Sequence, residues 1–126
     1  MKEENQPFLI SAEAHSAQRR RNCWLFLLQL KDGVYRVQHG PISAIEQLTG
    51  IPHDELAESG LGKFYCGGEA ERTRFMTKAH DEGKAFGYFS LIVPAGRLES
   101  RNRATCNEND GMIKLVKEVI LHERAA

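Results

Sequence analysis

The sequence lacks a long apolar run and an excess of charge of either sign. No stretch approaches the ~18 consecutive apolar residues that a membrane-spanning helix needs, and Met1–Gln6 has acidic residues where a secretion signal would be apolar. Lysine plus arginine and aspartate plus glutamate both number 17, so no net field draws the chain to nucleic acid or an anionic membrane. We therefore expect a bacterial-type cytoplasmic protein in which any anion binding comes from a local patch.

Cysteine is scarce, and the common metal and nucleophile motifs are missing. Cys23, Cys66 and Cys106 are odd in number and widely spaced, which fits neither a disulfide framework nor a paired-cysteine zinc site. The histidines show no HxH or HExxH spacing, and neither a Gly-x-Ser-x-Gly elbow nor a phosphate-binding glycine loop occurs. We expect no metal and no cofactor, with Cys23 and Cys66 as small buried residues of strands.

Two very apolar runs predict the sheet. Cys23–Leu30 is followed by the turn signal Lys31–Gly33 and the alternating run Tyr35–His39, an order typical of a β-hairpin. The first arm is too apolar to leave either face in water, so we expect a central strand covered on both sides. We pair it with the second run, Ala85–Val93, at the centre of the sheet. Leu61–Cys66 has the aromatic content of a further strand.

Helices are predicted from capping residues, the order of charges and glycine stops. The predicted ranges are Ala12–Arg21, Ile42–Thr49, Pro52–Ser59, Glu69–Glu82 and Met112–Arg124. The last of these has apolar residues at helical spacing with lysines and glutamates between them, and we expect it to be a C-terminal amphipathic helix.

These elements predict one α+β domain over residues 1–126. A hairpin comes first and no regular strand-helix-strand order follows, which favours a small mixed or antiparallel sheet of about four to five strands covered by helices. Residues 1–6 are expected to form a flexible tail. Residues 96–109 are polar and irregular in pattern, and we expect a long loop, which in a small domain is often functional.

Ile42–Ser59 resembles a helix-turn-helix, with Gly50 at the turn. Its second helix carries Asp54, Glu55 and Glu58, which have the wrong sign for DNA phosphates. We therefore expect a structural helical connection.

Two arginine groups are candidate sites for an anion. Arg19–Arg21 end a predicted helix, while Arg97, Arg101 and Arg103 lie in the predicted loop. Guanidinium groups suit phosphate and carboxylate, so the two groups would form an anion site if the fold brought them together. The alternative is that both are solvated surface charges.

A second candidate site follows Gly62. Cys66 precedes a helix whose N-terminus would activate a thiol, and Arg72 lies in that helix. The segment Gly62–Gly67 with this arginine-bearing helix resembles the second half of the GIY-YIG nuclease motif. The resemblance implies catalysis by Tyr65 and an arginine, with a later glutamate such as Glu118 holding a metal. It covers about a dozen residues, and the tyrosine-bearing strand that should precede it closely is missing, so we do not assign the family.

The sequence thus predicts a small non-enzymatic binding or interaction protein that recognises a protein partner or a small anionic ligand. The candidate ligand-binding residues are Arg72, Cys66, Arg97, Arg101 and Arg103. The alternatives are a small enzyme with a Cys66, Tyr65 and Arg72 site, or nucleic-acid binding through Arg19–Arg21 and Arg97–Arg103. The apolar strands exceed what the predicted helices can cover, which also predicts a homodimer.

Overall fold

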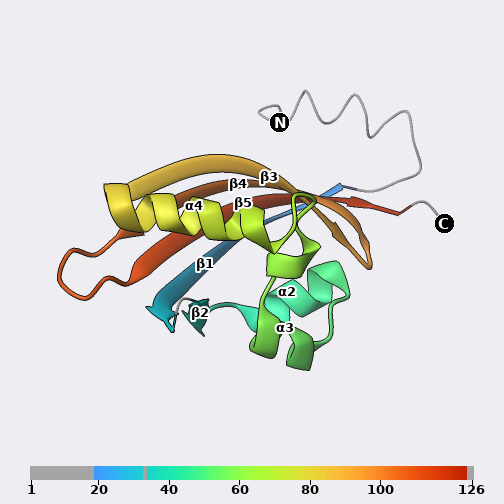
Figure 1. The fold of residues 1–126 in the computed structure, drawn as a ribbon. Coiled ribbons are helices and arrows are strands. Elements are labelled where there is room, and N and C mark those ends of the chain that lie inside the picture. Colours follow the sequence, from blue (N-terminus) through green and yellow to red (C-terminus); the bar gives the residue numbers. More distant parts are fainter. Residues whose placement is uncertain (1–18, 33, 125–126) are drawn as a thin grey trace.

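Five antiparallel strands form one sheet in the computed structural model, which describes residues 19–32 and 34–124, the side chains of Arg19 and Val34 excepted. The strands are β1 (Arg19–Lys31), β2 (Val34–His39), β3 (Lys84–Val93), β4 (Gly96–Cys106) and β5 (Ile113–Glu123). They lie in the order β2-β1-β5-β4-β3 (Figure 1). The helical elements α2 (Ile42–Thr49), α3 (His53–Ser59), η2 (Gly62–Phe64, a 3-10 turn) and α4 (Glu69–Glu82) all lie between β2 and β3 in the chain. The predicted α+β class, the hairpin of β1 with β2, and the helices α2, α3 and α4 are confirmed.

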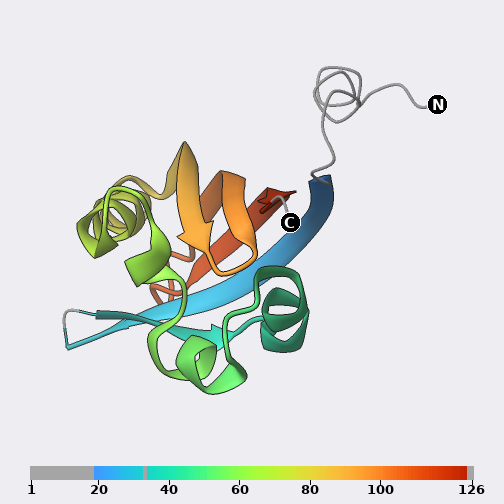
Figure 2. The ribbon, with the colours of Figure 1, turned by 90° about the vertical axis from the view of Figure 1, so that its right-hand side faces the viewer.

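The helices cover one face of the sheet and leave the other open. Helix α4 lies along β3 and β4, while α2 and α3 lie near β1 and β2 (Figures 1 and 2). On the covered face, Trp24, Phe26 and Leu28 of β1 are buried. Leu25 of the same strand points to the other face and is 47% exposed. No described helix lies over that face (Figure 2). The prediction that this strand is covered on both sides is therefore wrong.

Strand β5 stands where the C-terminal helix Met112–Arg124 was predicted, so that prediction is wrong. Every second residue from Ile113 to Leu121 is buried, and the middle one is Lys117. A lysine at this position hides the period-two pattern, although the β-branched residues favour a strand. Strand β5 also occupies the centre of the sheet, and β3 is an edge strand. The predicted central pairing of Ala85–Val93 with β1 is wrong.

Strand β4 replaces most of the polar loop predicted at 96–109. Its buried positions are Gly96, Leu98, Ser100, Asn102 and Ala104. All but Leu98 are small or polar, so they do not stand out as a core pattern. Ser100 Oγ donates a hydrogen bond to the carbonyl of Phe89, and this partner makes its burial tolerable. The loop prediction is wrong because polar residues with partners can occupy the inner face of a strand.

Smaller differences concern the ends of elements. Arg19–Arg21 begin β1, so the predicted helix Ala12–Arg21 is wrong over these residues. The rest of that helix and the predicted tail 1–6 lie outside the described residues. The predicted strand Leu61–Cys66 is wrong, because it forms η2 and one isolated bridge between Tyr65 and Leu91. No helix of the described residues is both long and apolar enough to cross a membrane.

Candidate binding sites on the two faces of the sheet

The open face, here called the outer face, carries rows of side chains that cross β1, β5, β4 and β3. The strand registers define three rows in that order: Leu25, Val116, Arg103, Phe86; then Cys23, Glu118, Arg101, Tyr88; then Arg21, Ile120, Glu99, Ser90. Phe86 and Tyr88 are 55% and 69% exposed, and their rings meet edge to face with centroids 5.4 Å apart. Two aromatic rings thus stand in solvent beside charged rows.

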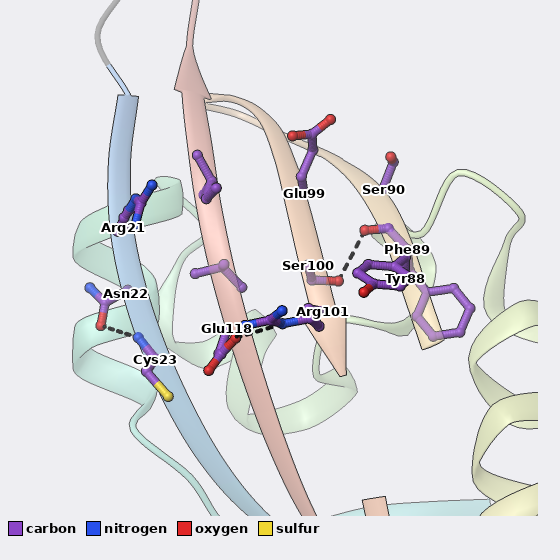
Figure 3. Close-up of a pocket in the computed structure, with 12 residues that line it drawn as sticks. Arg21, Asn22, Cys23, Tyr88, Phe89, Ser90, Glu99, Ser100, Arg101 and Glu118 are labelled. Carbon is purple, nitrogen blue, oxygen red and sulfur yellow. Dashed lines mark hydrogen bonds and ion pairs between the residues drawn. The ribbon is translucent and has the colours of Figure 1, made fainter. Parts of the chain in front are cut away.

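A hollow of about 830 Å³ lies over the second and third rows (Figure 3). Within it Arg101 and Glu118 point toward each other from β4 and β5, and Arg101 Nε donates a hydrogen bond to Glu118 Oε1 at 2.8 Å. Arg21 and Tyr88 line the same hollow from β1 and β3. The hollow therefore combines guanidinium groups, a carboxylate and an aromatic ring.

The outer face is cationic although the whole chain is neutral. Along its four strands from β1 to β3 the cations are Arg21, Lys84, Arg97, Arg101, Arg103 and Lys114, and the acids are Glu99 and Glu118. Both acids are already engaged: Glu118 by Arg101, and Glu99 by Arg97 and by His122 Nε2 at 2.9 Å. The excess of cations leaves positive charge on this face.

The hydrogen bond from Arg97 holds the pKa of Glu99 below its ordinary value, against the opposing effect of partial burial. We expect Arg97→Met to raise that pKa, measured by carboxyl-carbon NMR titration. A depressed carboxyl pKa contributes stability that is complete above the ordinary pKa and is lost as pH falls through the folded-state pKa. Arg103→Met is the control, because Glu99 forms its hydrogen bonds and ion pairs with Arg97 and His122, so that replacing Arg103 should leave the titration unchanged. An unchanged titration in Arg97→Met would contradict the assignment.

The predicted arginine sites meet in part on the outer face. Arg97, Arg101 and Arg103 lie on the outer side of β4, and Arg21 of the other group lines the hollow with Arg101. Arg20 instead pairs with Glu123 at 3.4 Å. The side chain of Arg19 lies outside the described residues.

The covered face contains a second candidate site, centred on Lys117. This lysine is 1% exposed, and its Nζ donates hydrogen bonds to Tyr65 Oη and Asn102 Oδ1, both at 2.6 Å. Burial, and to a smaller extent the nearby charge of Arg72, lowers the pKa of Lys117 to about 7. Burial also raises the pKa of Tyr65, so its phenol stays protonated. The site is a buried amine held by a neutral hydroxyl and an amide.

Arg72 completes this cluster from α4. It is buried, and its Nη2 donates to the carbonyl of Tyr35 at 3.5 Å while its Nη1 lies 3.7 Å from Glu69. A cavity of about 30 Å³ is lined by Tyr65, Arg72 and Lys117 together with apolar residues of β1, β2, α2, α3 and β5. The predicted grouping of Tyr65 with Arg72 therefore corresponds to one cavity.

Cys66 does not join that cavity. Its side chain is exposed and does not line the cavity, and Cys23 is exposed as well, so the prediction of buried strand cysteines is wrong for both. Glu118, the glutamate that the GIY-YIG resemblance suggested as a metal ligand, lies on the face of the sheet opposite Tyr65. The three residues of that resemblance do not assemble into one site.

Sequence reasoning missed Lys117 and Asn102. Reading Ile113–Leu121 with a period of two would have placed Lys117 among the inward residues, which is the one signal in the sequence.

No family model matches this chain, and no curated protein matches it. Within 19–32 and 34–124, no group of three or more histidine, cysteine, aspartate or glutamate residues could hold a metal ion.

Proposed function

We propose that this is a small non-enzymatic binding protein that recognises an acidic protein partner through the outer face of its sheet. The observation that carries the proposal is that no described helix covers this face, while it carries both exposed apolar side chains and an excess of cations. Monomeric proteins rarely expose a contiguous apolar patch without using it. An exposed strand surface with aromatic residues and arginine has the composition of a protein interface.

The charge of the face selects the kind of partner. Within the described chain Arg103, Lys84 and Lys114 make no ion pair, so their charges remain for a partner. Opposite potentials speed association and disfavour partners of like charge. Two copies of this cationic face would repel each other, which supports an acidic partner over the homodimer that the apolar content alone predicts.

The test uses two charge reversals on opposite faces. Arg103→Glu changes the outer face, and Arg74→Glu makes the same change on the exposed side of α4. A partner captured from lysate is identified, purified and titrated by calorimetry. We expect Arg103→Glu to weaken binding about tenfold or more and Arg74→Glu to leave the affinity unchanged. The proposal would be contradicted if Arg103→Glu bound the partner as tightly as the unmodified protein does, or if only Arg74→Glu weakened binding.

Light scattering on a size-exclusion column tests directly whether a second copy of the chain binds to the outer face. We expect the mass of one chain at ~100 μM, well above the micromolar dissociation constants of weak pairs. A mass of two chains that returns to one chain in Tyr88→Ser would make the second copy the occupant of the outer face. That result would replace the acidic partner and would support the homodimer.

The hollow favours a second candidate, a small anionic ligand. Its volume of about 830 Å³ is within the range of small-molecule pockets, and Arg21 and Arg101 both line it. Inorganic pyrophosphate is a suitable probe, followed by amide NMR shifts. Shifts confined to the residues of the hollow and lost in Arg101→Met would support this ligand. Shifts that spread over every exposed cation would leave the protein partner as the better proposal.

A further inference from the structure

The cavity beside Lys117 is donor-rich and has no acid in its wall. Three polar residues line it, Tyr65, Arg72 and Lys117, and the others are apolar or glycine. Two of these three are cations, and both are buried. Burying a charge without a counter-charge is costly, so buried cations normally have an acidic partner or a bound anion.

The available acids do not neutralise both cations. Glu69 approaches Arg72 at 3.7 Å, but its own side chain is 56% exposed, so solvent weakens the pair. Lys117 forms no ion pair with any described residue, and its two hydrogen bonds go to the uncharged groups of Tyr65 and Asn102. When Lys117 is protonated, its positive charge on the covered face is therefore without an acid.

Hydrogen-bond capacity is left over in the same place. A protonated Lys117 has a third N–H, and the Tyr65 hydroxyl, which accepts from Lys117, still has its own hydrogen to donate. Arg72 uses its donors only in long contacts, 3.5 Å to the Tyr35 carbonyl and 3.7 Å to Glu69. These groups would all be satisfied by one acceptor that carries negative charge.

We propose that the cavity between Tyr65, Arg72 and Lys117 is a binding site for one small monovalent anion, of the size of a halide or formate. The size limit comes from the volume, about 30 Å³, in a cavity where one water needs about 10–15 Å³. Phosphate esters and larger carboxylates are excluded on the same ground. The site is separate from the outer face, and neither proposal depends on the other.

Anion binding would also change the protonation of Lys117. The charge of Arg72 now disfavours the protonated amine, and an anion between the two cations favours it. Binding near pH 8 is therefore coupled to uptake of a proton by the amine. Glu69 and Glu71 on α4 are the acids on that side, and neither lines the cavity.

The first experiment measures thermal unfolding at pH 7 in sodium bromide, sodium formate or sodium gluconate at equal ionic strength. Gluconate is the control, because it is too large for the cavity. We expect a saturable rise in melting temperature of about 5 °C at tenfold the dissociation constant for bromide and formate only. Lys117→Met should lose this rise, and Lys114→Met, an exposed lysine of the same strand, should keep it. A rise that persists in Lys117→Met, or is equal in gluconate, would overturn the proposal.

A second experiment uses the unmodified protein, in case Lys117→Met does not fold. Crystals grown in sodium bromide should show one anomalous peak between Arg72 and Lys117, and calorimetric titration at pH 8 should show proton uptake as a buffer-dependent heat. Absence of the peak at a bromide concentration that saturates the thermal effect would overturn the proposal. A heat that is the same in buffers of different ionisation enthalpy would overturn it as well.

Discussion

Gly96→Ala is expected to destabilise the fold by about 2–6 kcal/mol, because both the backbone and the space at this position exclude a side chain. Gly96 has φ of +150°, a conformation that residues other than glycine rarely adopt. A Cβ atom there would lie 2.2 Å from the carbonyl oxygen of His122 and 2.9 Å from the amide nitrogen of Arg124. Both obstacles are backbone atoms of the chain at and just beyond the end of β5, so neither can rotate away.

The site of this clash explains why the effect should be global. Gly96 begins β4 and pairs with Glu123 at the end of β5, and the neighbouring Ala95 accepts a hydrogen bond from the Arg124 amide and donates one to the Thr49 carbonyl. A shift here would therefore disturb the central strand pair and the end of α2 together. Urea denaturation measures the free energy of unfolding, and we expect it to be lower in Gly96→Ala than in the unmodified protein.

Gly111→Ala is the matched control for that measurement. Gly111 also has a positive φ, +72°, but no atom lies within 4 Å of its would-be Cβ. Its substitution should therefore carry only the backbone cost, about 1–2 kcal/mol. Equal losses at the two positions would show that the close approach to β5 is not what restricts Gly96.

The parts of the fold that could be predicted are those with local signals. The hairpin of β1 and β2 has an apolar run, a turn and an alternating run in order, and α2 ends at Gly50 and α4 at Gly83, both with positive φ. These features are set by neighbours in the chain. They required no knowledge of which strands meet.

Strands β4 and β5 could not be predicted in this way, because their inner positions are read correctly only when their partners are known. Lys117 is buried because Tyr65, 52 residues away, and Asn102, 15 residues away, accept its hydrogen bonds. Lysine is almost never buried unless paired, so a pattern based on single residues assigns it to the surface. With Lys117 assigned outward, the remaining apolar residues of β5 fit helical spacing.

The candidate site on the outer face follows the same logic. The sequence indicated that the two arginine groups could bind an anion together, but it could not place them on one side of one sheet. That placement depends on β5 lying between β1 and β4, which brings Arg21 and Arg101 to one hollow. Once Lys117 is known to point inward, Glu118 must point outward, so one strand contributes to both candidate sites.

The free energy of unfolding is expected to rise by about 3 kcal/mol between pH 7 and pH 10, because of Lys117. In the folded chain burial lowers the pKa of this amine from 10.5 to about 7. Between these values the unfolded chain binds a proton that the folded chain does not bind, so stability increases with pH. The slope for one proton is about 1.4 kcal/mol per pH unit.

Other groups of the cluster do not produce this rise. Arginine and carboxyl side chains ordinarily titrate outside this range of pH. Burial raises the pKa of Tyr65, which works in the opposite direction, since it removes stability only above about pH 10, where the unfolded tyrosine loses its proton. The range from pH 7 to pH 10 therefore isolates the amine.

Urea denaturation at pH 7, 8, 9 and 10 measures the effect, with Lys117→Met and Lys114→Met as the pair of variants. Methionine has a similar length and no charge, so Lys117→Met should remove the rise, although it leaves Tyr65 and Asn102 without their shared donor. Lys114 is exposed on the same strand, and its replacement should leave the slope as in the unmodified protein. If Lys117→Met does not fold, the nitrogen NMR shift of the Lys117 amine gives the pKa directly. A midpoint near 10.5, or parallel stability profiles in all three proteins, would show that the buried amine is charged in the folded state and is not the source of the pH dependence.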